Sequence, residues 1–177
     1  MAARLRTLAD LAPHVSKAYA DIAPTNNDAT AEYKASVHLA DQTGREELTA
    51  LLAAAMTERR AEEIQRGVSL VGPHRDDLVL SLGMLPAKGY ASHGESWSFA
   101  LALKLGSFSL LRADGVEPVL VLDDVFAELD TTRRERLATG VSAAEQVLVT
   151  AAVGADVPEQ LSGRRFTVAD GQVAEDD

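Results

Sequence analysis

The sequence of 177 residues contains no cysteine, which excludes disulfide bonds and thiolate metal sites. No apolar run is long enough to cross a membrane. The first ten residues carry charges where a signal peptide needs an apolar stretch. We therefore expect a cytoplasmic protein without membrane contact, long enough to bury a sizeable core in one or two domains.

Positive charge is also scarce, since 17 Lys and Arg face 27 Asp and Glu, for a formal net charge of −10. Proteins that neutralise nucleic-acid phosphates usually carry a basic patch. Basic residues here form small groups that are more typical of solvated helix faces and turns: Arg59-Arg60, His74-Arg75, Arg133-Arg134 with Arg136, and Arg164-Arg165. Charge alone therefore gives no support for DNA binding.

A third absence concerns nucleotide binding. The pattern Gly-x-x-x-x-Gly-Lys-Ser/Thr occurs nowhere, so the chain has no loop that cradles β- and γ-phosphates as a P-loop does. A nucleotide site built from these residues alone would be incomplete.

The most informative segment that is present covers residues 119–130, Val-Leu-Val-Leu-Asp-Asp-Val-Phe-Ala-Glu-Leu-Asp. It is typical of a parallel strand buried between helices on both faces. Open α/β sheets bind ligands at the carboxyl ends of such strands. Asp123 would then hold Mg²⁺, directly or through water, and Asp124 would orient or deprotonate an attacking water. The alternative is a buried strand followed by an Asp-rich turn.

A second informative segment, Ser-His-Gly-Glu at residues 92–95, opens an apolar helical run over residues 97–111. The Ser92 hydroxyl, bare backbone N–H groups near Gly94 and the helix dipole together favour an anion site. The same residues form a capping box, with Ser92 as N-cap and Glu95 at the third position. Both interpretations can hold at once.

Periodicity predicts the remaining elements. We expect a first amphipathic helix that ends near Ile22 and is kinked at Pro13, and a loop at residues 24–28. A capping box of Thr43 and Glu46 should open a second helix, whose core-packed face comprises Leu48, Leu51, Leu52, Ala55 and Met56. Strands are expected at 31–39, 78–82, 119–122 and 146–150. A helix should begin at Thr131 or Thr132, with Glu135 completing a capping box. A hairpin is expected around Asp170-Gly171, followed by a frayed tail at 175–177.

In order and spacing, the segments at 92–95 and 119–130 resemble the signature motif, Walker B strand and D-loop of ATP-binding-cassette ATPases. The resemblance is closest to the RecF family of bacterial DNA replication and repair proteins, in the SMC-like branch. Residues 72–78, Gly-Pro-His-Arg-Asp-Asp-Leu, and 101–105, Leu-Ala-Leu-Lys-Leu, support it. The family's phosphate loop lies near the amino terminus of a chain about twice as long, so we expect a carboxyl-terminal portion.

The resemblance implies an α/β fold, a partial ABC-type ATPase head. Residues 1–117 would form helical lobe II with the signature helix. Residues 118–177 would form the carboxyl-terminal part of nucleotide-binding lobe I, with Walker B, D-loop and closing strands. Because the first strands of that sheet are absent, we expect exposed apolar edges and marginal stability or aggregation of the isolated chain.

The resemblance also implies a role for each site residue. In cassette ATPases two heads sandwich two ATP molecules, so the signature would contact the γ-phosphate held by a partner subunit. Asp124 replaces the usual Glu and is shorter, which favours slow hydrolysis. Ser92, Gly94 and Glu95 would form the signature, Asp123 would hold Mg²⁺ and Asp124 would activate water. Glu128 and Asp130 would belong to the D-loop, and Thr150 is a candidate γ-phosphate sensor in place of a histidine. Asp130 could equally be the N-cap of the next helix.

The function that follows from the resemblance is an ATP-dependent DNA-binding clamp in replication and recombinational repair. ATP and Mg²⁺ would drive dimerisation on gapped or junction DNA, with slow hydrolysis releasing it. The implied partners are DNA, a second copy, and the mediators RecO and RecR. The alternative is a non-catalytic assembly module that needs a partner chain and binds no nucleotide.

Overall fold

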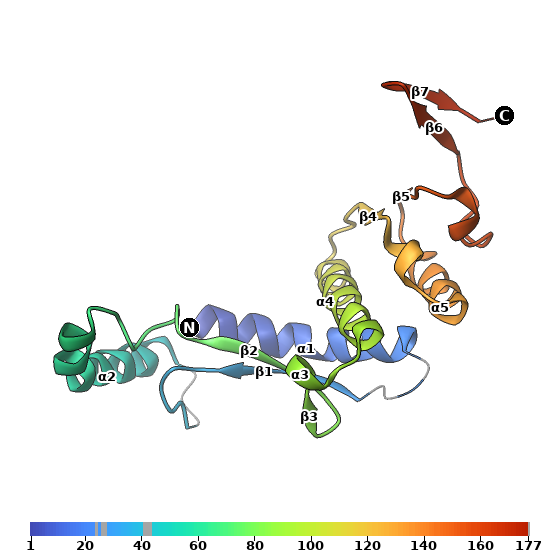
Figure 1. The fold of residues 1–177 in the computed structure, drawn as a ribbon. Coiled ribbons are helices and arrows are strands. Elements are labelled where there is room, and N and C mark those ends of the chain that lie inside the picture. The colour runs from blue at the N-terminus through green and yellow to red at the C-terminus, as the bar shows by residue number, and fades with distance from the viewer. Residues whose placement is uncertain (24, 26–27, 41–43, 177) are drawn as a thin grey trace. The chain divides into compact units, whose positions relative to one another are not determined.

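The chain packs as two compact units, Met1–Val116 and Glu117–Asp177. This computed structural model describes residues 1–23, 25, 28–40 and 44–176, and Figure 1 shows the elements of both units. Residues 24 and 26–27 of the expected loop lie outside this description. The assignment of residues 1–117 and 118–177 to lobes II and I stays a prediction.

The first unit combines an antiparallel sheet with long helices. Its strands run in the order β1-β2-β3, with Ala29 of β1 opposite Leu82 of β2. Helix α1 lies along β1, and α4 crosses α1 (Figure 1). The elements are α1 (Ala2–Ile22), β1 (Ala29–Lys34), α2 (Arg45–Arg66), β2 (Asp77–Leu82), β3 (Leu85–Pro86), α3 (Ala87–Tyr90) and α4 (His93–Ala113).

The core of this unit lies where α1 meets α4. The rings of Tyr19 and Phe99 are both buried, with centroids 4.8 Å apart. Gly106 of α4 approaches α1 so closely that a Cβ there would lie 2.9 Å from the backbone nitrogen of Val15. The expected first helix is confirmed, with Pro13 inside it. This packing fixes α4, whose first turn carries the Ser92 segment.

Helix α2 differs from the expectation. Of the predicted apolar face, Leu48 is buried, Leu51, Leu52 and Ala55 are half-buried and Met56 is 50% exposed, so the face is packed only in part. The reason is position, because α2 lies at the end of the unit away from α4 (Figure 1). The expected N-cap Thr43 lies outside the described residues, and Gly44 directly precedes the helix.

The second unit is built on a parallel pair of strands joined by a helical crossover. Strand β4 pairs with β5, with Leu120 opposite Val147 and Asp123 opposite Thr150. Its elements are β4 (Leu120–Asp123), η1 (Val125–Glu128), α5 (Thr131–Val141), β5 (Val147–Thr150), η2 (Gly154–Asp156), β6 (Phe166–Ala169) and β7 (Gln172–Glu175).

Only one face of the β4–β5 pair is covered. Leu120 and Leu122 are buried, whereas Val121 is 58% and Leu148 50% exposed. The prediction that helices cover both faces of β4 is therefore wrong for this chain. A single crossover helix can cover only one face of a two-stranded sheet.

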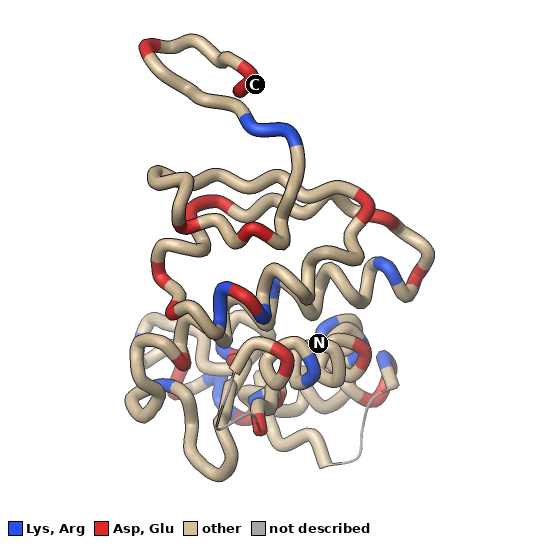
Figure 2. The backbone as a smooth tube through the Cα atoms, turned by 90° about the vertical axis from the view of Figure 1, so that its right-hand side faces the viewer, with Lys and Arg blue, Asp and Glu red and all other residues tan. Residues whose placement is uncertain are grey.

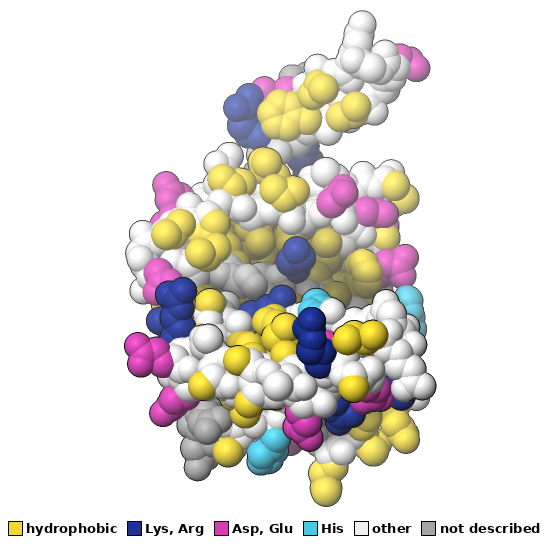
Figure 3. Space-filling model, turned by 90° about the vertical axis from the view of Figure 1, so that its left-hand side faces the viewer, with side chains coloured by type: hydrophobic (Ala, Val, Ile, Leu, Met, Phe, Trp, Pro, Cys, Tyr) yellow, Lys and Arg dark blue, Asp and Glu magenta, His cyan; other side chains and the backbone are white. Residues whose placement is uncertain are grey.

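Strands β6 and β7 form the expected hairpin. Asp170 has φ 51° and Gly171 has φ 75°, which are the left-handed conformations of a two-residue hairpin turn. Its hydrophobic side chains stay exposed (Figure 3, top). Glu175, expected in a frayed tail, instead ends β7 and accepts a 2.6 Å hydrogen bond from Arg164, while Asp177 lies outside the described residues.

None of the described helices combines the length and apolar character that a membrane span requires.

The close approach of Gly106 to Val15 predicts an asymmetry between two Gly→Ala substitutions. Gly106→Ala should destabilise the chain by roughly 1–3 kcal/mol, because the new methyl overlaps α1. Gly140→Ala in α5 meets no atom within 4 Å and should stabilise by about 0.5–1 kcal/mol through helix propensity. Urea unfolding followed by circular dichroism measures both. Equal effects of the two substitutions would contradict the packing at Gly106.

Candidate functional site

Two carboxylates lie at the carboxyl end of β4. Asp123 is the last residue of the strand, and both it and Asp124 are exposed. Asp124 adopts a left-handed conformation, φ 52° and ψ 24°, which Asp tolerates better than most residues. The chain then turns into η1, whose Phe126 is buried. The strand thus delivers both carboxylates to solvent at the sheet end where α/β folds bind ligands.

Thr150 joins these two residues from the neighbouring strand. Its hydroxyl donates a hydrogen bond to Oδ1 of Asp123. The backbone N–H of Asp124 lies 3.1 Å from both the Thr150 hydroxyl oxygen and the Thr150 carbonyl oxygen. The structure therefore brings together three of the predicted site residues, although their chemical roles stay predictions.

The donor set fits part of a magnesium site. Among the described residues no group of three or more His, Cys, Asp or Glu side chains could hold a metal ion. Mg²⁺ in nucleotide sites, however, is held by one or two carboxylates together with waters and phosphate oxygens. Asp123 and Asp124 supply carboxylates of that kind, so the remaining ligands would come from the nucleotide.

Asp130, the predicted D-loop residue, is the N-cap of α5. Its carboxylate accepts a hydrogen bond of 2.9 Å from the Arg133 backbone N–H and pairs with the Arg133 guanidinium. The backbone hydrogen bond, helped by the Arg133 charge, holds the pKa of Asp130 below its ordinary value. The expected capping box with Glu135 is therefore wrong, since Asp130 occupies the cap position. Glu128 lies exposed in η1.

In the first unit, Ser92 and Glu95 form the predicted capping box. The Glu95 backbone N–H donates to the Ser92 hydroxyl oxygen at 3.3 Å, and the Ser92 backbone N–H donates to the Glu95 carboxylate at 2.8 Å. Ser98, fully buried one turn later, donates to the Gly94 carbonyl at 2.8 Å. The cap is confirmed, and the exposed Ser92 hydroxyl also lies where an anion would meet the positive end of α4.

A polar network around Asp76 was not predicted. The Asp76 carboxylate accepts hydrogen bonds from the Tyr33 hydroxyl and, at 2.7 Å, from the Ser36 backbone N–H. The Ser36 hydroxyl in turn lies 3.2 Å from the Gly72 backbone nitrogen and 3.2 Å from its carbonyl oxygen. This network ties the 72–78 segment to the end of β1. Its partners lie about forty residues apart in sequence, so no local pattern could have revealed it.

Acidic charge is concentrated in the second unit. Residues 1–116 hold 12 Lys and Arg against 14 Asp and Glu, a net charge of −2, whereas residues 117–177 hold 5 against 13, a net charge of −8. Figure 2 shows this distribution along the backbone. Cations are therefore favoured over anions around the β4 carboxylates.

Each of the four basic groups includes an arginine with an internal partner. Arg59 pairs with Glu62 at 2.8 Å, Arg134 with Asp156 at 2.9 Å and Arg164 with Glu175 at 2.6 Å, and the Arg75 Nε–H donates to the Ser69 carbonyl at 2.7 Å. These guanidinium groups are partly committed to the fold, which limits what they can offer to phosphates.

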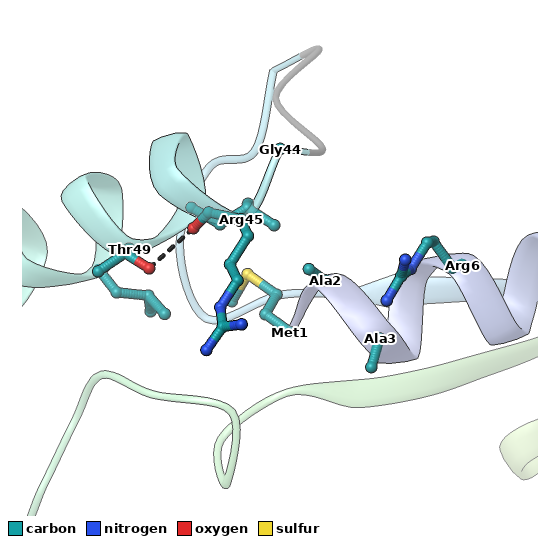
Figure 4. A pocket seen from close by; sticks show the side chains of 9 residues that line it. Met1, Ala2, Ala3, Arg6, Gly44, Arg45 and Thr49 are labelled. Carbon is teal, nitrogen blue, oxygen red and sulfur yellow. Dashed lines mark hydrogen bonds between the residues drawn. The ribbon is translucent and has the colours of Figure 1, made fainter.

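A hollow of about 630 Å³ lies between the first turns of α1 and α2 (Figure 4). Arg6 and Arg45 project from the two helices beside it, and the Thr49 hydroxyl donates to the Arg45 carbonyl at 2.8 Å. None of the predicted site residues lines this hollow, so it is separate from the carboxylates and from the signature segment. Its other lining residues are Met1, Ala2, Ala3, Gly44, Leu48 and Leu52.

Comparison with known sequences gives consistent relatives, although no protein-family model matches the chain. The chain is 57% identical over 185 residues to the DNA replication and repair protein RecF of Cutibacterium acnes. It is 60% identical over 173 residues to the protein of the same name from Streptomyces avermitilis. These matches cover 98% of this chain but 47% and 46% of the relatives, so the chain spans about half of their length.

Solved structures show the same fold. A structure of the recombination mediator protein RecF with ATP, from the RecFOR pathway, has a TM-score of 0.78 at 24% identity and covers 99% of this chain and 46% of that one. A structure from work on ATP-driven dimerization and DNA-stimulated activation of SMC ATPases has a TM-score of 0.52 at 15% identity, covering 99% and 88%. The predicted α/β head fold is thus confirmed.

The capping box predicts how α4 responds to two substitutions. Ser92→Ala should destabilise the first unit by about 1 kcal/mol, because it removes the hydroxyl that accepts the Glu95 N–H. Glu95→Gln should have a smaller effect, since glutamine also serves in capping boxes. Urea unfolding of the two variants tests this, and a larger loss for Glu95→Gln would contradict it.

The Asp76 network predicts a pH dependence. Burial raises the pKa of Asp76, but hydrogen bonds from Tyr33 and Ser36 outweigh it and lower the pKa below the ordinary value. A folded pKa below the unfolded one stabilises the fold above the ordinary value, about 3.9, and this contribution is lost as pH falls through the lowered pKa.

Asp76→Asn should therefore cost roughly 1–3 kcal/mol at neutral pH, because it removes a charged hydrogen-bond acceptor. The difference from the unsubstituted chain should shrink as pH falls below about 4, because the unfolded carboxyl takes up its proton there and the native one does so at still lower pH. Unfolding in urea at pH 7 and at pH 3 measures it. The matched control Asp77→Asn changes an exposed neighbour and should have little effect at either pH. A difference independent of pH would contradict the charged role of Asp76.

Proposed function

Because the chain belongs to the RecF family of DNA replication and repair proteins, we propose that it supplies part of an ATP-dependent DNA-binding clamp. The observation that best supports this proposal is the site at the end of β4. There Asp123 and Asp124 reach solvent at the carboxyl end of a parallel strand, beside Thr150. The chain spans about half of its relatives, so the proposal concerns the whole protein, with a phosphate loop supplied by the rest.

In this proposal the acidic half of the site, Asp123 and Asp124, binds the metal ion and positions the attacking water. Asp123 holds Mg²⁺, directly or through a water, and Asp124 orients or deprotonates the attacking water. When bound, Mg²⁺ neutralises charge that develops on the β- and γ-phosphates. Asp124 is one methylene shorter than a glutamate, which supports slow hydrolysis as the timing step of the clamp.

The signature half acts on a nucleotide bound by a second head. Ser92 and Gly94 contact the γ-phosphate at the positive end of α4. The Ser92 hydroxyl, which donates to the Glu95 carboxylate at 2.8 Å without nucleotide, turns its proton to the phosphate when ATP binds. Glu128 and Asp130 lie on the D-loop that faces the partner. Because these contacts exist only with ATP present and two heads joined, ATP binding drives dimerisation.

The DNA-binding part of the proposal rests on the family. The second unit has a net charge of −8, and Arg59, Arg134 and Arg164 are paired internally. We therefore expect most contacts with DNA phosphates to come from the remainder of the protein. Gapped or junction DNA is the proposed substrate, RecO and RecR are the proposed mediators, and the proposed location is the cytoplasm.

A second candidate is an assembly module that binds a partner chain and no nucleotide. The exposed Val121 and Leu148 favour it, because an uncovered apolar sheet face needs a partner. The two functions differ in one respect, since only the clamp requires ATP for self-association.

The proposal predicts how the intact protein dimerises, with this chain joined to the phosphate-loop portion found in its relatives. ATP should shift the protein from monomer to dimer in analytical ultracentrifugation, and Ser92→Arg should abolish the shift by blocking the phosphate seat. Ser107→Arg, an exposed position on the same helix, is the matched control and should dimerise normally. If ATP leaves the intact protein monomeric, Ser92 is only a cap and the assembly module is the better function.

A further inference from the structure

The Thr150 hydroxyl makes two hydrogen bonds, and a phosphate sensor could not keep the one that it donates. A threonine hydroxyl has one proton and two acceptor lone pairs. Its proton is used on Oδ1 of Asp123, and its oxygen accepts from the Asp124 N–H at 3.1 Å. To donate to a γ-phosphate, Thr150 would have to release Asp123.

The second observation is the backbone of Asp124. A left-handed conformation at a residue other than glycine, here φ 52°, is unfavourable by itself and persists where surrounding contacts hold it. The Asp124 N–H is held by two oxygens of Thr150, the hydroxyl and the carbonyl at 3.1 Å. The left-handed conformation of Asp124 is therefore held by hydrogen bonds to β5.

Register makes this arrangement specific. Asp123 and Thr150 are direct partners in the parallel pair, so the hydroxyl reaches the carboxylate from the adjacent strand. The bond uses one acceptor site on Oδ1 of Asp123 and fixes the orientation of the carboxylate that would hold a cation. One side chain thus orients both carboxylate residues of the site.

We propose that Thr150 is a positioning residue, whose hydroxyl fixes the Asp123 carboxylate and the Asp124 turn for ATP hydrolysis and does not contact the γ-phosphate. This inference rests on the proposed function and replaces the sensor role expected from the sequence. It assigns to a β5 hydroxyl the alignment of the metal ligand and of the residue that directs the water.

The test compares Thr150→Val, which keeps the shape and removes the hydroxyl, with Thr150→Ser, which keeps the hydroxyl. In the intact protein, Thr150→Val should lower kcat by about 10- to 100-fold, as loss of an outer partner of a metal ligand typically does. The KM for ATP and ATP-driven dimerisation should stay unchanged, and Thr150→Ser should restore kcat. Thr139→Val, which removes an exposed hydroxyl on α5, is the matched control.

A readout without nucleotide tests the contact itself. Amide hydrogen exchange of the segment covering residues 120–128 should speed up in Thr150→Val and stay near the native rate in Thr150→Ser. Valine removes the hydroxyl, one of the two acceptors of the Asp124 N–H, and leaves only the backbone carbonyl. Unchanged exchange together with weaker ATP binding and weaker dimerisation would overturn the inference and restore the sensor role. Native behaviour of Thr150→Val in every assay would also overturn it.

The two proposals fail separately. If the unsubstituted intact protein does not dimerise with ATP, the clamp function is refuted, and with it the proposed role of Thr150 in ATP hydrolysis. If it dimerises and hydrolyses ATP but Thr150→Val exchanges and turns over normally, only the positioning role is refuted.

Discussion

The parallel register of β4 and β5 is the constraint on which the acidic site depends. It sets Asp123 opposite Thr150, and the Thr150 hydroxyl and carbonyl then hold the Asp124 turn. A slip of one residue would move every side chain of β5 to the other face and separate the hydroxyl from the carboxylate. Val147 and Val149, the half-buried residues of β5 opposite Leu120 and Leu122, resist such a slip because it would expose their apolar side chains.

The signature half depends on a different interaction, the close crossing of α1 and α4. Gly106 permits that approach, and the Tyr19–Phe99 ring pair fills the space beside it. Helix α4 is thereby anchored along its length, so its first turn can remain exposed and still be ordered by the capping box. Each half-site thus has its own structural support within its own unit, which suits a nucleotide site completed by groups from two heads.

Local chemistry explains what the sequence could predict. The spacing of apolar residues and the presence of turn residues predicted α1, α4, the β4 strand and the hairpin at Asp170-Gly171, because each of these depends on neighbours along the chain. The exposure of Val121 and of the apolar face of α2 depends on which elements pack over them. The spacing of apolar residues in the sequence does not predict that packing. The Asp76 network and the Thr150 bridge join residues 26 or more positions apart, so they require the fold itself.

The distribution of charge separates the two tasks that the proposed clamp must perform. Around β4, a net charge of −8 favours Mg²⁺ and opposes the DNA backbone, so the acidic unit is suited to hydrolysis and unsuited to DNA. The first unit is nearly balanced at −2, with arginines such as Arg59 and Arg75 already bonded internally. A clamp built on this chain must therefore draw its DNA affinity from elsewhere in the protein. In the proposed function, dimerisation through Ser92 would be the step by which this chain controls DNA binding without contacting much of the DNA itself.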